Sequence, residues 1–366
     1  MRSIFFVLAI LTGCTSLSKD DNSMTTYFAE NQTPGYVLWK IKDGEIVFQQ
    51  SGGLRAIDFE TKITPQDRWH IGSCTKSMTA YLIGILIDED HVRLNDKVIK
   101  FFPKATQLKH LTIQDLLTHR SGLPEVTELQ DKTAWSESFR RDKPVSELRQ
   151  NFVNAVLKEK PRFARDSKFA YSNNNYVLLG TIIEKIEKDS WENSLNKRIF
   201  QKLGMSEDCG FGPQATRDLT PPDQPWGHTL VEGKLTSVPP KTKEMIPSDN
   251  PLAIGPAGTV HCSFESWSKF LIEMLNASNG QSKLLKNVTA KKFFEPYKDQ
   301  MTYAGWGGII NPERGTIRYT MVGSNTMNYA LYVIDPKKKL IFMGATNSGT
   351  EKSLMALYGK LKELDK

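Results

Sequence analysis

Short β-rich runs lie at both ends of the chain, and the apolar residues in its middle have mainly helical spacing. Residues 36–41 and 46–49 are separated by Lys42-Asp43-Gly44-Glu45, and an Asp-Gly pair between such runs predicts a β-hairpin. Near the C-terminus, similar runs predict strands over 316–322, 329–334 and 340–346, followed by a final helix.

Between these strands the pattern changes from helical to proline-rich. Apolar residues from about Ser73 to Asp88 occupy nearly every helical face, which predicts a centrally buried helix. Residues 110–205 are mainly helical by periodicity, whereas nine of the 18 prolines fall in 209–258 and exclude long helices there. Ser263 is the expected N-cap of another helix that ends near Asn276.

This order of elements predicts an α/β (α+β) fold with one antiparallel sheet formed from the N- and C-terminal strands and flanked by helices. We expect residues 34–88 and 259–366 to form this α/β sheet domain. Residues 89–258 are expected to form an inserted, mainly helical domain.

The first fifteen residues have the pattern of a secretion signal. Arg2 precedes an apolar stretch from Ile4 to Leu11, which has the length of a signal-peptide core. The stretch ends in Leu11-Thr12-Gly13-Cys14, which resembles the lipobox of bacterial lipoproteins and implies cleavage before Cys14 and acylation of its thiol. A plain signal peptide with a chance cysteine is the alternative.

We therefore expect residues 1–13 to be a lipoprotein signal peptide and residues 14–33 to be a tether, with a short helix in the polar stretch 20–33. Two or more acyl chains on Cys14 would anchor the protein firmly to a membrane of the bacterial cell envelope. Because Thr15 rather than an acidic residue follows the cysteine, the resemblance implies the periplasmic face of the outer membrane if the cell is Gram-negative.

Composition describes an ordinary globular protein of 366 residues, 39% hydrophobic and 24% charged, which excludes a disordered chain. After residue 15 no apolar run approaches the roughly 20 residues that cross a bilayer. The net charge of +7 is spread along the chain, so we expect no nucleic-acid partner. Cys74, Cys209 and Cys262 form no C-x-x-C pair and the histidines no H-E-x-x-H motif, so we expect no metal and no cofactor. At most one disulfide is possible among these three cysteines.

The sharpest chemical feature is Ser73-Cys74-Thr75-Lys76. Residues three apart on a helix share a face, so the hydroxyl of Ser73 and the amine of Lys76 can come within hydrogen-bond reach. A serine needs a base to become a nucleophile, and burial at a helix N-terminus lowers the pKa of a lysine so that it can serve as one. The spacing alone is common, and an exposed Ser-Lys pair is the alternative.

A second candidate group is Tyr171-Ser172-Asn173, 98 residues after Ser73 and directly before an apolar helix. A phenol can relay protons, and an amide can hold a substrate carbonyl or orient a lysine. By themselves, a tyrosine at a strand end and an asparagine at a helix N-cap are the simpler interpretation.

Together these motifs resemble the serine β-lactamase and penicillin-binding protein superfamily, in its class C-like branch. S-x-x-K is a known nucleophile motif of these enzymes. The resemblance rests on the sequences at Arg68–Ser77, Leu116–Pro124, Phe169–Asn173, Leu179–Glu184, Leu203–Met205, Pro256–Gly258, Gly305–Gly307 and Val333–Pro336. These motifs run in order from about Gly35 to Asn347.

The resemblance implies a role for each matching position. Ser73 would be the acylated nucleophile, Lys76 its proton acceptor and Tyr171 the general base or relay. Asn173 would contact substrate, and the backbone N–H groups of Ser73 and Ser324 would form the oxyanion hole. His119 has no implied catalytic role and is expected to pin a loop.

The third motif departs from the family pattern. The family has a cation, a small residue and a glycine on the strand that lines the site, whereas this chain has Met321-Val322-Gly323. Gly323 would let substrate approach the strand, and Met321 would stand in the substrate-binding site. The thioether of Met321 cannot supply positive charge to a substrate carboxylate or to Tyr171. The usual glycine-rich turn is also replaced, by Asn325-Thr326-Met327-Asn328.

We therefore expect an envelope serine hydrolase that forms an acyl-enzyme at Ser73 on an ester or amide, as an esterase or D-amino-peptidase would. A class C-like β-lactamase or D,D-carboxypeptidase is the first alternative, and Met321 argues against its efficiency. A non-catalytic lipoprotein that keeps the pocket for binding is the second. The expected partners are a small-molecule or peptide substrate and, through Cys14, the membrane.

Overall fold

The computed structural model describes residues 21–366 apart from 141, 215–219, 241–247, 299–301, 304–305, 309–314 and 316. Cys14 and the expected signal peptide lie outside the described residues. Among the described helices, none combines the length and the apolar character needed to cross a bilayer.

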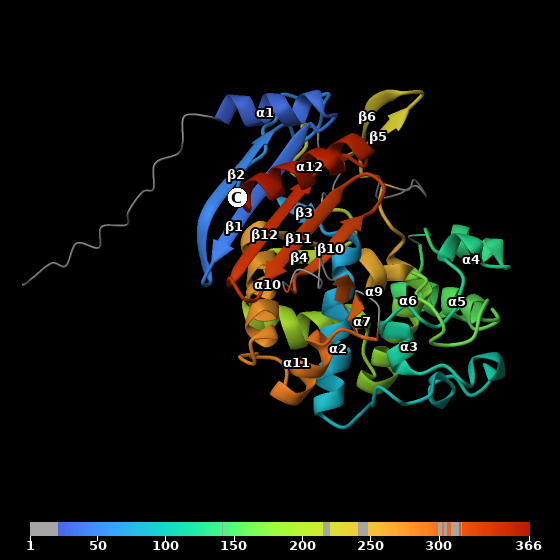
Figure 1. Ribbon diagram of the computed structural model, residues 1–366. Coiled ribbons are helices and arrows are strands. Elements are labelled where there is room, and N and C mark those ends of the chain that lie inside the picture. Colours follow the sequence, from blue (N-terminus) through green and yellow to red (C-terminus); the bar gives the residue numbers. More distant parts are fainter. Residues whose placement is uncertain are drawn as a thin grey trace, which may run out of the picture.

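The two ends of the chain meet in a five-stranded antiparallel sheet, as the terminal β-rich runs predict (Figure 1). Its order is β10-β11-β12-β1-β2, and β1 pairs directly with β12 along its whole length. The strands are β1 (Gly35–Lys42), β2 (Glu45–Gly53), β10 (Tyr319–Ser324), β11 (Tyr329–Asp335) and β12 (Leu340–Thr346). The predicted fold class is therefore confirmed.

Helices cover both faces of this sheet. α1 (Asp21–Glu30) and α12 (Glu351–Leu364) lie on one face, while α10 (Phe264–Ser278) packs on the other (Figure 1). Alternation along β1 supports both layers, because Tyr36 and Leu38 face α1 and α12 whereas Val37 and Trp39 belong to the main core.

Residues 21–30, expected to lie in a tether, form part of the folded sheet domain. Phe28 of α1 is fully buried and its ring stacks on Tyr36 at 4.2 Å between centroids. Burying a phenylalanine contributes roughly 1.5–3 kcal/mol, which holds the helix to the sheet. The expectation of a tether is thus wrong from residue 21 onward. It arose because polar residues outnumber the few apolar residues that anchor this helix.

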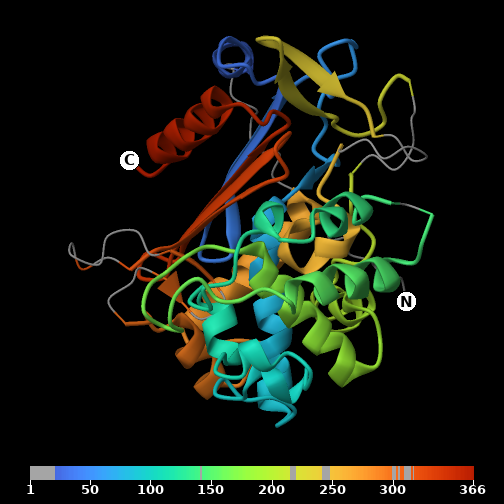
Figure 2. The ribbon, with the colours of Figure 1, turned by 90° about the vertical axis from the view of Figure 1, so that its right-hand side faces the viewer.

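The helix predicted from Ser73 begins as a 3₁₀ turn, η1 (Gly72–Cys74), and continues as α2 (Thr75–Asp88). Twelve residues of α2, from Thr75 to Leu86, are buried. α2 packs against α6 (Asn173–Glu187), α7 (Trp191–Leu195) and α9 (Gly255–Gly258), so it lies between the sheet and the helices of the middle of the chain. Figure 2 shows these helices gathered at one end of the sheet.

The helices between residues 110 and 205 follow the predicted periodicity. They are α3 (Ile113–Leu117), α4 (Lys132–Glu137), α5 (Val145–Val156), α6 (Asn173–Glu187), α7 (Trp191–Leu195) and α8 (Gln201–Leu203). The helices α9 (Gly255–Gly258) and α11 (Asn287–Phe294) were not predicted. Ser263 caps α10 by accepting the N–H of Ser266, as the sequence predicts.

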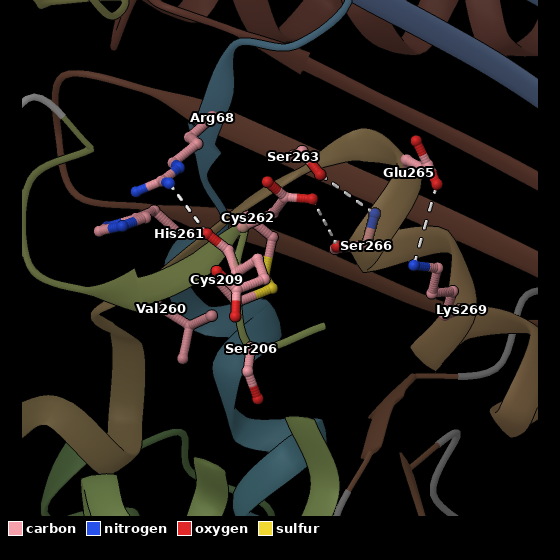
Figure 3. Close-up of a disulfide and its surroundings, with 12 residues drawn as sticks. Arg68, Ser206, Cys209, Val260, His261, Cys262, Ser263, Glu265, Ser266 and Lys269 are labelled. Atoms are coloured by element: carbon pink, nitrogen blue, oxygen red, sulfur yellow. Dashed lines mark hydrogen bonds and ion pairs between the residues drawn. A yellow bond between two sulfur atoms is a disulfide. The ribbon is translucent and has the colours of Figure 1, made fainter. Parts of the chain in front are cut away.

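The proline-rich segment contains short strands and a disulfide. Cys209 and Cys262 are bonded and join β4 to β7 (Figure 3), while Cys74 is free and buried. The small sheets comprise β3 (Arg68–His70), β7 (Val260–Ser263) and β4 (Cys209–Phe211), then β5 (Gly227–Val231) with β6 (Lys234–Val238), and β8 (Thr302–Tyr303) with β9 (Trp306–Gly308). The sheet β3-β7-β4 leads directly into η1 and therefore supports the residues described next.

Candidate active site

The turn that carries Ser73 packs very tightly against β10. Gly72 has a φ of +49°, and a Cβ atom there would lie 2.2 Å from the amide nitrogen of Ser324. A Cβ atom on Gly323 would lie 1.9 Å from the carbonyl oxygen of Ile71. Only glycine fits at these two positions. This close approach brings the backbones at Ser73 and Ser324, the expected oxyanion donors, to the same place.

Three predicted side chains meet at the start of α2. The Ser73 hydroxyl oxygen lies 3.0 Å from Lys76 Nζ and 2.7 Å from the hydroxyl oxygen of Tyr171. Helical spacing brings Ser73 to Lys76, whereas Tyr171 arrives on the loop that precedes α6. A nucleophile in contact with both a base and a second proton carrier is the arrangement that nucleophilic catalysis requires.

Lys76 is fully buried and makes two further hydrogen bonds, at 2.7 Å to Asn173 Oδ1 and 2.6 Å to the carbonyl oxygen of Ala257. Desolvation lowers its pKa to about 7, although Glu125 and Cys74 act in the opposite direction. A neutral amine has two N–H donors and one lone pair. Because Asn173 and Ala257 offer only acceptors, they take the two donors and leave the lone pair for the Ser73 hydroxyl.

Tyr171 presents its phenol at the surface of the site. The residue is 43% exposed, and its hydroxyl oxygen lies 3.3 Å from Asn173 Oδ1, which is a second acceptor for its single proton besides the Ser73 oxygen. Desolvation of the phenol raises the pKa of Tyr171, while the Ser73 hydrogen bond lowers it and Glu125 raises it. The phenol is therefore protonated at neutral pH, which suits a relay that donates and accepts a proton in turn.

The ring of His119 packs against the ring of Tyr171. The two rings are stacked at 4.6 Å between centroids, and His119 Nδ1 accepts the backbone N–H of Ser172 at 3.2 Å. Desolvation, followed by the nearby charge of Lys76, lowers the pKa of His119 to about 3, so the imidazole is neutral. These contacts fit the loop-pinning role expected for this histidine.

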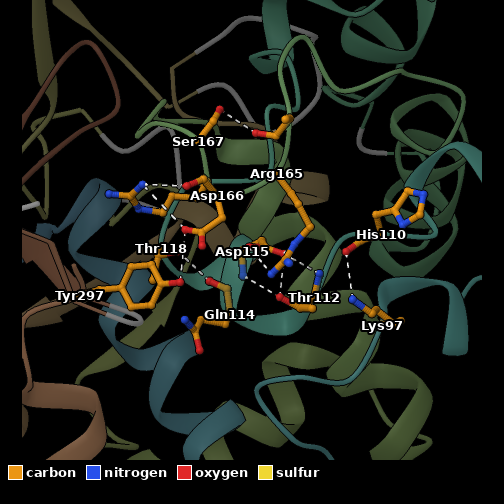
Figure 4. A network of polar contacts seen from close by, with 12 residues as sticks. Lys97, His110, Thr112, Gln114, Asp115, Thr118, Arg165, Asp166, Ser167 and Tyr297 are labelled. Atoms are coloured by element: carbon orange, nitrogen blue, oxygen red, sulfur yellow. Dashed lines mark hydrogen bonds and ion pairs between the residues drawn. The ribbon is translucent and has the colours of Figure 1, made fainter. Parts of the chain in front are cut away.

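Polar contacts anchor the loop that leads to Tyr171. Asp115 accepts the N–H and hydroxyl of Thr112 and also binds Arg165, with 2.7 Å between Nε and Oδ2 (Figure 4). The adjacent Asp166 receives the hydroxyl of Tyr297 at 3.2 Å. The loop is thus fixed to α3 and to the segment after α11 before the chain reaches Tyr171.

Glu125 is a site residue that the sequence analysis did not identify. Its carboxylate accepts the backbone N–H of Asn173 at 2.8 Å and also the side-chain amide of Asn173. The amide oxygen of Asn173 is thereby turned toward Lys76. Glu125 follows the Leu116–Pro124 motif directly, but its partner is 48 residues away, so no local spacing signals the contact.

In the third motif, the side chain of Met321 points into the core rather than into the site. Met321 is 9% exposed, and its sulfur accepts a hydrogen bond from the hydroxyl of Ser77 at 3.8 Å, in the core beneath α2. Val322 is the exposed side chain of this strand, at 43%. Strand alternation thus turns Met321 away from the side that Val322 presents to solvent. Its burial argues against the expected direct contact of Met321 with substrate.

Comparisons with known proteins agree with this geometry. A family model described as Beta-lactamase matches residues 21–362. "Protein flp" of Staphylococcus aureus (strain MRSA252) is 28% identical over 178 residues, which are 47% of this chain and 34% of that protein. The match thus spans about a third of this relative's length.

Two solved structures share the fold. An octameric penicillin-binding protein homologue from Pyrococcus abyssi has a TM-score of 0.74 and 26% identity, covering 95% of this chain and 77% of the other. D-amino acid amidase from Ochrobactrum anthropi SV3 has a TM-score of 0.72 and 18% identity, covering 96% and 100%. The second likeness is one of fold alone.

Proposed function

We propose, from the premise that the chain belongs to the beta-lactamase family of serine hydrolases, that it hydrolyses an ester or amide through an acyl-enzyme on Ser73. The observation that carries the proposal is the contact of the Ser73 hydroxyl with both Lys76 and Tyr171, at 3.0 and 2.7 Å. A serine hydroxyl that contacts only water would have no adjacent base to accept its proton.

In the first step, neutral Lys76 takes the hydroxyl proton while the Ser73 oxygen forms a bond to the substrate carbonyl carbon. The negative charge that develops on the carbonyl oxygen is held by the N–H groups of Ser73 and Ser324. Tyr171 then donates its phenolic proton to the leaving oxygen or nitrogen and regains a proton from Lys76, as the bond to the leaving group breaks. An ester on Ser73 and a neutral Lys76 remain.

In the second step, a water molecule repeats the attack. Tyr171 accepts the water proton and passes its own proton to Lys76 as the water oxygen bonds to the acyl carbon, and one proton then returns to the departing Ser73 oxygen. The products are a carboxylic acid and free serine. Lys76 and Tyr171 therefore serve both half-reactions.

The side chains around the third motif favour substrates that do not depend on a carboxylate group for binding. Met321 and Val322 supply no positive charge on the strand where the family usually has a cation. We therefore place neutral esters and amides first, with D-amino amides included because one fold neighbour is a D-amino acid amidase. A β-lactamase or D,D-carboxypeptidase remains the first alternative, and a non-catalytic binding protein the second.

One panel of reagents separates these functions. The purified protein and its Ser73→Ala variant are treated with a fluorophosphonate, a fluorescent penicillin, a chromogenic cephalosporin, a p-nitrophenyl ester and a D-amino acid amide. Ser73-dependent fluorophosphonate labelling with ester or amide turnover supports the proposal. Rapid cephalosporin turnover would favour the first alternative, and no labelling or turnover with any reagent would favour binding alone.

Replacing Val322 with lysine tests the substrate preference. Val322 is the exposed side chain of β10, so an ammonium at this position should raise kcat/KM for an ester that bears a free carboxylate relative to its neutral methyl ester, by about 10-fold. Val322→Leu, which adds volume without charge, is the matched control. An unchanged ratio in Val322→Lys would mean that this position does not act on substrate.

Glu125→Gln tests the electrostatics around the base. Because the Glu125 carboxylate raises the pKa of Lys76, its loss should lower that pKa and shift the ascending limb of the kcat/KM–pH profile to lower pH. Glu147→Gln on α5 is the control, since Glu147 is exposed and pairs with Lys143 away from the site. A profile that stays in place, or moves to higher pH, contradicts the assigned base.

We also propose that the protein is a lipoprotein anchored through Cys14 in the cell envelope. Support comes from the lipobox-like sequence and from the Cys209–Cys262 disulfide, because disulfides persist in oxidising compartments.

A further inference from the structure

A buried His–Asp pair that the mechanism above does not use lies directly behind the nucleophile turn. His70 of β3 is 2% exposed and Asp249 is 4% exposed. The imidazole Nε2 and the carboxylate Oδ1 are 2.8 Å apart, within the distance but not the alignment of a hydrogen bond. A buried carboxylate costs free energy unless polar partners compensate it, so its other contacts matter.

The histidine holds the residue before the nucleophile. His70 Nδ1 accepts the backbone N–H of Gly72 at 3.0 Å. Because Nδ1 accepts this hydrogen bond, the ring nitrogen that can donate a proton is Nε2, on the side of Asp249. Gly72 is the positive-φ residue whose position allows the close approach of Ser73 to β10.

The aspartate holds the residue after the second oxyanion donor. Asp249 Oδ1 accepts the side-chain amide of Asn325 at 2.8 Å. The amide oxygen of Asn325 in turn accepts the N–H of Met327 at 3.2 Å and the side-chain amide of Asn328 at 3.0 Å. These bonds build the turn after β10 from side chains, in place of the glycines that the family usually has there.

The same oxygen of Asp249 is linked, through Asn250, to the segment whose carbonyl holds Lys76. It accepts the backbone N–H of Asn250 at 2.7 Å, and the Asn250 side chain donates to the carbonyl oxygen of Gly258 at 2.7 Å. The preceding carbonyl, of Ala257, is the acceptor that holds Lys76 Nζ. One carboxylate therefore links the segments around Gly72, Asn325 and Gly258, which are far apart in the sequence.

We infer that His70 and Asp249 are positioning residues that fix the spacing of the oxyanion hole and its nucleophile. The inference rests on the proposed function, and it assigns neither residue a contact with reacting atoms. An N–H donor on each side of the hole is useful only if both point to one oxyanion position. The pair holds the chain immediately before one donor and immediately after the other.

The test combines kinetics with hydrogen–deuterium exchange, which needs no activity. His70→Leu, Asp249→Leu and Asn325→Ala break the connection at three points. His261→Leu is the matched control, because His261 pairs with His70 across β3 and β7, is equally buried and bonds only to the carbonyl of Gly212 among the described residues. If Asp249→Leu yields no folded protein, the other two variants decide.

The expected result is faster exchange in the peptides that contain Gly72 and Asn325, with exchange in β1 unchanged. With the ester substrate, kcat should fall by about 10²-fold while KM changes less than threefold, as for a misplaced catalytic group. His70→Asn, whose side-chain oxygen can accept the Gly72 N–H, should recover part of kcat. His261→Leu should change melting temperature without this loss.

Two results would overturn the inference. One is a kcat within threefold of wild type in His70→Leu and Asn325→Ala, and the other is unchanged exchange around Gly72 and Asn325 in both variants. If wild-type protein neither turns over nor is labelled by any reagent of the panel, the proposed function fails. Exchange in those two peptides then still decides whether the pair fixes the geometry.

Discussion

Ser73→Ala is expected to abolish turnover of the ester or amide substrate, with a loss in kcat on the order of 10⁶-fold as in serine hydrolases that lose their nucleophile. Without the hydroxyl no acyl bond can form, and the remaining donors of the oxyanion hole can only assist attack by water. Steady-state kinetics measure the loss of turnover, and fluorophosphonate labelling measures the loss of the nucleophile.

Ser77→Ala is the matched control for this variant. Ser77 lies one turn further along α2, is fully buried and bonds to the hydroxyl of Tyr332 at 2.9 Å rather than to the site. Its loss should lower the melting temperature but leave labelling of Ser73 intact. Labelling that persists in Ser73→Ala would mean that a different residue is the nucleophile.

The second large effect concerns the protonation state of Lys76. Burial lowers the pKa of this lysine to about 7, and only the neutral amine can accept the serine proton. The acylation rate should therefore rise as pH increases, with a midpoint near 7, and reach a plateau above about pH 8. Pre-steady-state acylation measured from pH 5.5 to 9 gives this profile directly.

Lys76→Arg separates the base from the charge. A guanidinium keeps the positive charge but does not lose its proton in proteins, so acylation should fall by about 10²–10⁴-fold at all pH values. Lys185→Arg on the exposed face of α6 is the control and should leave the profile unchanged. Substantial activity in Lys76→Arg would remove the lysine from the role of base.

Much of the architecture was predictable because β11 and β12 are nearly continuous apolar runs and the helices in the middle of the chain have clear periodicity. The meeting of the two termini followed from that order of elements. α1 was missed as a packed helix because its mean composition is polar and Phe28 alone gives no periodic signal. The first turn of the nucleophile helix is a 3₁₀ turn because Gly72 has positive φ and must fit against β10.

The residues of the site likewise divide into those that the sequence predicts and those that only the fold brings together. Ser73 and Lys76 were predictable because one helical turn brings them together, and Tyr171 because its motif resembles a known family. Glu125, His70 and Asp249 were not identified, since each acts on residues brought close only by the fold. Met321 was placed correctly on β10, but the side of the strand it faces depends on the packing of α2.

The most direct measurement is the site of covalent modification. The protein is reacted with a fluorophosphonate near pH 8, and the intact mass and the digested peptides are analysed by tandem mass spectrometry. A single adduct on the hydroxyl of residue 73, whose rate of formation falls as pH decreases through 7, is the predicted result. An adduct on another residue, or none on native protein, would contradict the account.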